Sequence, residues 1–285
     1  MNQERKVTRF IFNGDEPEIQ LASTPGRLNE SELEEALLVM VDLSLVKRFF
    51  RVRSTLEALV RVNKPHWGLV LWLGGAALDD VPDSVWELAN LEGLDLDNNK
   101  LKTLSPAIAK LTKLRRLWIS WNPWEGFPEA VCQLEQLEKL VVDDCQLSDI
   151  PSSFASLRNL LELNLEFNYF EEVPEVICEL RSLVKLELGD NKLSSLPRSF
   201  AKLRELRNLD LSRNRFKEFP LVLCELSGME HLYMYTNQMS ELPMSITKLI
   251  RLRYLYLGGN LFASFPLFLG DLPRLVYLTS SGNSN

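Results

Sequence analysis

Residues 163–185 read LNLEFNYFEEVPEVICELRSLVK, and residues 186–208 read LELGDNKLSSLPRSFAKLRELRN. Both stretches are 23 residues long, begin with L-x-L, and place an asparagine five residues and a proline eleven residues after the first leucine. The same spacing continues in both directions without insertion or deletion. A fixed period of this length predicts a repeat architecture in which each repeat is one structural unit.

Asparagine marks the period along most of the chain. It recurs at Asn99, Asn122, Asn168, Asn191, Asn214, Asn237, Asn260 and Asn283. Only Ala76 and Cys145 interrupt this column. We expect each asparagine to be a buried amide that bonds the backbone groups left unpaired where the chain leaves a strand.

The leucines and prolines predict the elements of each repeat. The L-x-L alternation predicts a short strand with one buried face. A proline followed by apolar residues three and six positions later predicts a single 3-10 or α-helical turn. One strand and one turn in 23 residues form a coil of a solenoid, which buries its apolar side only against neighbouring coils. The strands would then form a parallel sheet.

These residues resemble the leucine-rich repeat family. The pattern L-P-x-x-[IV]-x-x-L-x-x-L-x-x-L-x-L-x-x-N-x-L is similar to that of its Ras-group subclass, which also includes many bacterial proteins. Nine repeats and a truncated tenth cover residues 67–285. The resemblance implies an α/β solenoid: a horseshoe with a parallel concave β-sheet, short helical or 3-10 turns on the convex side, and a use in protein–protein binding.

Residues 1–66 do not repeat, and we expect them to form a helical N-terminal cap region. Capping-box motifs begin at Ser31 and Ser54, and the second predicted helix runs through Leu59 and Val60. The apolar residues before Gly14 are compatible with either a hairpin or a loose segment. The basic stretch over residues 47–64 fits a solvated helix face better than a nucleic-acid or lipid surface.

The composition excludes several classes of function. Leucine fills 56 of 285 positions, and 39 acidic residues outnumber 32 basic ones, which gives a net charge of −7. The whole excess lies in the repeats, because residues 1–66 hold ten acids and ten bases. This balance argues against nucleic-acid binding, and no apolar run is long enough for membrane insertion. Four cysteines without metal or disulfide spacing favour a cytoplasmic setting, with a secreted bacterial effector as the alternative.

The side chains between and after the two leucines of each strand are expected to line the concave face. The two columns hold six carboxylates and no lysine or arginine, and aromatic residues bracket these acids. Tyrosine and tryptophan are enriched in binding hot spots. We therefore expect a protein or peptide partner with basic groups flanked by apolar anchors. The predicted partner-binding residues are Trp72, Asp95, Asp97, Trp118, Trp121, Asp143, Glu166, Glu187, Asp210, Tyr233, Tyr235 and Tyr256.

No catalytic, cofactor or metal site is predicted. Neither His66 nor His231 has a nucleophile at motif spacing, and no phosphate loop is present. Asp97 and Asp143 lie two repeats apart, about 10 Å along a sheet, which is too far for one cation. The chain is therefore expected to be a non-catalytic scaffold, or alternatively the recognition module of a longer signalling, ubiquitin-ligase, kinase or GTPase-type protein. An open strand edge at the C-terminus favours one of three arrangements: self-association with another copy, further sequence after Asn285, or protection of the edge by the polar tail.

Overall fold

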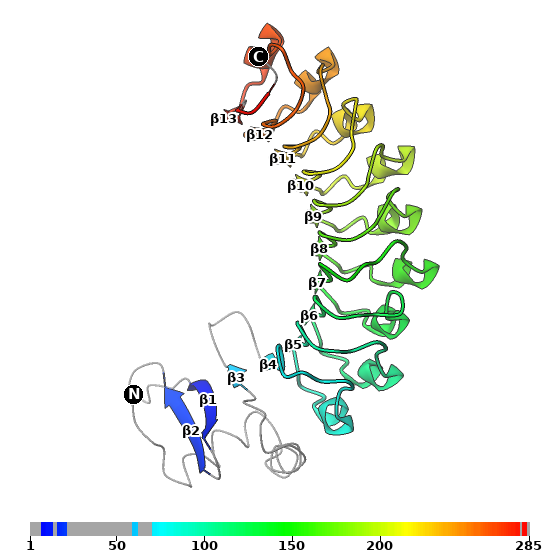
Figure 1. Cartoon of the computed structure of the whole chain (residues 1–285), viewed down its shortest axis with the longest axis vertical. Helices are drawn as coiled ribbons and strands as arrows, with labels where there is room; N and C mark the ends of the chain where they lie inside the picture. The colour runs from blue at the N-terminus through cyan, green and yellow to red at the C-terminus, as the bar shows by residue number, and fades with distance from the viewer. Residues whose placement is uncertain (1–6, 14–15, 22–58, 62–69, 280, 284–285) are drawn as a thin grey trace. The chain divides into compact units, whose positions relative to one another are not determined.

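The computed structural model describes residues 7–13, 16–21, 59–61, 70–279 and 281–283 (Figure 1). The chain divides into two compact units, residues 1–137 and 138–285. Both contain the same repeated coil, which consists of a three-residue strand and a five-residue 3-10 turn. Within the described ranges, no helix is both long enough and apolar enough to cross a membrane.

The first unit joins an antiparallel hairpin to three repeat coils. The hairpin strands are β1 (Val7–Asn13) and β2 (Glu16–Leu21), so the hairpin alternative for this segment is confirmed. The repeat strands pair in parallel, in chain order. They are β4 (Val70–Trp72), β5 (Gly93–Asp95) and β6 (Arg116–Trp118), and their turns are η1 (Asp83–Glu87), η2 (Pro106–Lys110) and η3 (Glu129–Gln133).

The prediction of a helix through Leu59 and Val60 is wrong. These residues belong to strand β3 (Leu59–Arg61), which pairs antiparallel with β4 and places Val60 opposite Leu71. The outer edge of β4 presents N–H and C=O groups, and an extended segment can satisfy them whereas a helix cannot. The remainder of the expected helical cap, including the motifs at Ser31 and Ser54, lies outside the described residues.

The second unit contains seven described strands, all parallel and paired in chain order. Figure 1 shows them side by side, with the 3-10 turns on the opposite side of the coils. The strands are β7 (Lys139–Val141), β8 (Glu162–Asn164), β9 (Lys185–Glu187), β10 (Asn208–Asp210), β11 (His231–Tyr233), β12 (Tyr254–Tyr256) and β13 (Tyr277–Thr279). The turns are η4 (Ser152–Ser156), η5 (Glu175–Glu179), η6 (Arg198–Lys202), η7 (Leu221–Glu225), η8 (Met244–Lys248) and η9 (Leu267–Asp271).

The register between strands follows the repeat of the sequence. Leu186 lies opposite Leu209, and Leu209 lies opposite Leu232, so residues 23 positions apart are neighbours across the sheet. The leucines are fully buried on the inner side, while the residues on either side of them are half-buried and face outward. Each column of the sequence therefore becomes a row of side chains across the strands.

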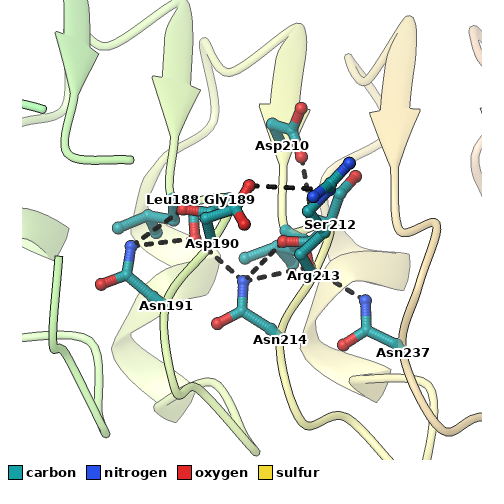
Figure 2. Close-up of polar contacts among 10 residues, drawn as sticks. Leu188, Gly189, Asp190, Asn191, Asp210, Ser212, Arg213, Asn214 and Asn237 are labelled. Atoms are coloured by element: carbon teal, nitrogen blue, oxygen red, sulfur yellow. Dashed lines mark hydrogen bonds and ion pairs between the residues drawn. The ribbon is translucent and has the colours of Figure 1, made fainter. Parts of the chain in front are cut away.

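The asparagines bond backbone groups at the strand ends, as predicted, and they also join their coils to the preceding ones. Asn191 illustrates the arrangement (Figure 2). Its Nδ2 donates to the carbonyl oxygens of Leu165 at 2.9 Å, Leu188 at 3.2 Å and Gly189 at 3.1 Å, and its Oδ1 accepts the backbone N–H of Phe170 at 3.0 Å. Asparagines one coil and two coils further on repeat this pattern, so the backbone groups at the end of each strand are satisfied within the fold.

Cys145 interrupts the column without opening the coil, since it is only 1% exposed. Its N–H donates to Asn168 Oδ1 at 3.2 Å, and its Sγ donates to the carbonyl oxygen of Asp143 at 3.3 Å. In the first unit, the indole Nε1 of Trp124 donates to the carbonyl oxygen of Ile119 at 3.0 Å. The same carbonyl oxygen also accepts Nδ2 of Asn122 at 3.3 Å.

Candidate partner-binding face

The outward residues of the second unit form two adjacent rows, which we call the strand face. The row at the strand ends consists of Val141, Asn164, Glu187, Asp210, Tyr233, Tyr256 and Thr279. The row two residues further along each coil consists of Asp143, Glu166, Gly189, Ser212, Tyr235, Gly258 and Ser281. Because each row changes from acidic to aromatic along the sheet, the strand face has two chemically distinct halves.

Stacked rings make up the aromatic half. Tyr233 and Tyr256 lie 4.4 Å apart between ring centroids with an interplanar angle of 9°. His231 and Tyr254, one position before the inward leucines, stack at 4.5 Å and 14°. Tyr277 continues both stacks at an inclined angle. The rings are thus held by one another and by the sheet, and they offer apolar surface that has little side-chain freedom left to lose.

Two carboxylates meet over a glycine in the acidic half. A Cβ atom added to Gly189 would lie 2.9 Å from Glu166 Oε1 and 3.4 Å from Asp210 Oδ1. Both oxygens therefore border the space above a residue without a side chain. Asp210 is also the direct neighbour of Tyr233 across the sheet, so the acidic and aromatic halves adjoin.

The lysines and arginines near the strand face are paired with other acids. Lys185 Nζ lies 2.7 Å from Glu187 Oε1 in its own strand, and Arg213 Nε lies 3.7 Å from Asp190 Oδ2. In the part of the chain that the structure describes, no lysine or arginine forms an ion pair with Glu166 or Asp210. Glu166 and Asp210 therefore differ from Glu187 and Asp190, which have basic partners.

The surroundings of these acids favour their protonated forms. Burial, followed by the charges of Glu187 and Asp210, raises the pKa of Glu166 to about 7. Burial also raises the pKa of Asp210, although bonds from Ser212 oppose the shift. His231 does not compensate, because burial lowers its pKa and favours the neutral ring. A positive charge placed beside these acids would favour their ionised forms.

The predicted acids of the first unit have structural roles. Asp95 was expected on the face, but it is buried at 9% exposure, and its Oδ1 accepts the N–H of Asp97 at 2.8 Å. Asp97 in turn accepts the N–H of Ser120 at 2.6 Å. Asp95 can fold inward because the residue beside it, Gly74, has no side chain, and a Cβ there would lie 2.9 Å from Asp95 Oδ1.

The predicted tryptophans of the first unit behave differently from one another. Trp72 and Trp118 are half-buried and stack with centroids 5.6 Å apart at 24°. Trp121 is 58% exposed and has a positive φ of 56°. Stacking therefore joins two of the three, and the third projects from the turn that follows its strand.

Sequence reasoning missed Phe167, which occupies the position of Trp121 two repeats later. It is 50% exposed and also has a left-handed φ of 53°. A bulky residue in this conformation is unfavourable by about 1–2 kcal/mol. The 46-residue spacing between the two aromatics is the signal that could have identified it.

The remaining predicted residues of the second unit are only partly brought together. Glu166, Asp210, Tyr233 and Tyr256 form the continuous patch described above, and Glu187 borders it while paired with Lys185. Asp143 and Tyr235 lie half-buried in the second row. Within the described residues, no group of three or more histidine, cysteine, aspartate or glutamate side chains could hold a metal ion.

Comparison with known proteins agrees with the coil geometry. Family models described as leucine rich repeat match residues 90–111, 135–193 and 174–216. The chain belongs to the leucine-rich repeat family. A search of curated proteins gave no match for this leucine-rich repeat chain.

Solved structures of leucine-rich repeat proteins resemble this one. A leucine-rich repeat protein of Leptospira interrogans is 30% identical with a TM-score of 0.63; the match covers 73% of this chain but only 59% of that one. An internalin (inlF) from Listeria monocytogenes is 21% identical with a TM-score of 0.61, covering 87% of this chain and 77% of that one. A plant peptide hormone receptor solved in complex with RGF2 is 21% identical with a TM-score of 0.50; the match covers 72% of this chain and 42% of that one. The last two likenesses concern the fold alone.

Proposed function

We propose that this leucine-rich repeat protein is a non-catalytic scaffold that binds a protein or peptide through the strand face of its second unit. Two carboxylates, Glu166 and Asp210, pair with no lysine or arginine among the described residues, and one of them lies next to a pair of stacked tyrosines; this arrangement carries the proposal. Asp210 adjoins Tyr233 directly, so one ligand can use both kinds of surface at once.

The two halves of the strand face would contribute differently to binding. Tyrosine rings that are already stacked lose little conformational entropy when a partner covers them, so they would supply most of the affinity. The carboxylates of Glu166 and Asp210 would attract a basic partner and set its register. The partner we propose therefore carries basic groups next to apolar ones.

The fold of the structural relatives supports a binding role without identifying a partner. One receptor of this fold has been solved in complex with a ligand, RGF2. The chain spans 59% of the length of the Leptospira protein, so the activity of a longer relative is not transferred to it. The four cysteines are buried and form no disulfide among the described residues, which supports the further proposal of a cytoplasmic setting.

The proposal is tested by affinity capture with the wild type and two variants. Tyr233→Ala combined with Tyr256→Ala removes the stacked pair but leaves the inward leucines in place. Lys202→Glu, on turn η6 away from the strands, is the control. We expect the double variant to lose the captured proteins and the control to retain them, with circular dichroism showing that both are folded. Capture of the same proteins by all three would refute the strand face as the binding site.

A further inference from the structure

We propose that the partner binds as an extended segment in which one lysine or arginine enters the space over Gly189, and an apolar residue four positions away packs on Tyr233 and Tyr256. This inference rests on the proposed function and adds the chemistry and spacing of the ligand. It commits to a linear basic segment of a partner protein as the occupant of the strand face.

Charge complementarity selects the basic residue. Glu166 Oε1 and Asp210 Oδ1 both border the position of the missing Gly189 side chain, at 2.9 Å and 3.4 Å from it. An ammonium or guanidinium group placed just above this position could donate to both oxygens. Lys185, the basic residue of the strand that leads to Gly189, already pairs with Glu187, and no lysine or arginine of the described residues forms an ion pair with Glu166 or Asp210.

The aromatic half selects the apolar residue. Tyr233 and Tyr256 are parallel within 9°, so their exposed edges form one continuous surface across strands β11 and β12. Half-buried rings of this kind favour an aliphatic or aromatic side chain.

The strand spacing determines the separation of the two ligand residues. Gly189 follows β9, whereas the tyrosine pair belongs to β11 and β12. Adjacent strands lie about 4.8 Å apart, which separates the centre of the pair from Gly189 by about 12 Å. An extended peptide advances about 3.3 Å per residue and alternates its sides, so residues i and i+4 face the same way about 13 Å apart. A separation of two or six residues fits less well.

The experiment uses the full-length chain on an array of nine-residue peptides. In the array, one lysine or arginine and one leucine or phenylalanine are moved independently through a glycine–serine background. Four proteins are compared: the wild type, Glu166→Gln with Asp210→Asn, Gly189→Ala, and the control Gly270→Ala. A Cβ at Gly270 meets nothing within 4 Å, whereas a Cβ at Gly189 occupies the proposed site without changing any charge.

We expect the wild type and Gly270→Ala to prefer a four-residue separation by roughly tenfold, the effect of a charge-assisted hydrogen bond. The double variant and Gly189→Ala should lose the preference for the basic residue but keep that for the apolar one. The inference is overturned if the wild type shows no such preference, or if the double variant retains it. Neither result would change the outcome of the capture test of the strand face, so a failure of this inference can be distinguished from a failure of the proposed function. Thermal melts confirm that each protein is folded.

Discussion

Replacing Asn191 with alanine tests how the coils are held together. The three carbonyl oxygens that accept its amide each keep a second donor, since Asn168 also reaches Leu165, Asn214 reaches Leu188, and the Phe167 N–H reaches Gly189. The Phe170 N–H is different, because Asn191 Oδ1 is its acceptor. The variant therefore leaves one buried N–H group unsatisfied.

The expected loss follows from that single group. An unsatisfied buried donor costs about 1–3 kcal/mol, so we expect Asn191→Ala to lower the free energy of unfolding by about 2 kcal/mol. The loss should be local, because repeat stability is a sum of contributions from coils and their interfaces. Hydrogen exchange of the Phe170 amide should accelerate about 30-fold, which corresponds to the same free energy.

Urea unfolding followed by circular dichroism measures the first quantity, and hydrogen exchange measures the second. Ser195→Ala is the matched control, because Ser195 is exposed on the same coil. If Asn191→Ala and Ser195→Ala unfold at the same urea concentration, the amide column does not stabilise the stack in the way described. If exchange accelerates equally in all coils, the assignment of the cost to Phe170 is refuted.

Three further predictions concern single side chains. The pKa of Glu166, about 7, lies above the ordinary 4.5, so Glu166 contributes stability that is fully present below pH 4.5 and is lost as the pH rises through 7. Glu166→Gln should therefore raise the free energy of unfolding at pH 8.5 by about 1–2 kcal/mol after allowance for solvent screening. Urea titrations at pH 5 and pH 8.5 check this prediction. Trp124→Phe should cost about 1 kcal/mol more than Trp86→Phe in the same assay, because the Trp124 indole donates to a carbonyl oxygen whereas the buried Trp86 indole N–H has no hydrogen-bond partner among the described residues. Equal losses would contradict the role given to Trp124. Phe167→Gly should raise the free energy of unfolding by about 0.5–1 kcal/mol, because glycine adopts the left-handed φ of this position without steric cost. A loss of stability would show that the phenylalanine ring packs favourably.

The architecture of the coils could be predicted from the sequence because it depends on local patterns that recur. A strand from L-x-L, a turn after proline and a buried amide at asparagine each follow from residue type and spacing alone. Repetition then places like residues next to one another, as Leu186 beside Leu209 shows. The prediction of strand rows was therefore sound even though no long-range contact was visible in the sequence.

The chemistry of the candidate site was harder to predict because it depends on neighbours in other coils. Asp95 and Asp210 occupy equivalent positions in the repeat, and each lies beside a glycine and accepts the N–H two residues further on, yet Asp95 is buried whereas Asp210 is half-buried. Glu187 and Glu166 also looked alike, yet Lys185 neutralises the former. Burial and ion pairing, rather than position in the repeat, distinguish these carboxylates from one another.

The strand at Leu59–Arg61 shows the same limit in the backbone. A capping box and helical spacing predicted a helix there, and local propensity was overruled by the hydrogen bonds that the edge of β4 offers. No pattern within the segment itself reveals that such an edge is nearby.

Site-specific photocross-linking tests the proposed binding face most directly. p-Benzoylphenylalanine replaces Tyr256 in one protein and Lys202 in another, and cross-linked partner peptides are identified by mass spectrometry. We predict cross-links from position 256 to a segment with lysine or arginine four residues from an apolar residue, and none from position 202. Cross-links from position 202 alone would contradict binding at the strand face.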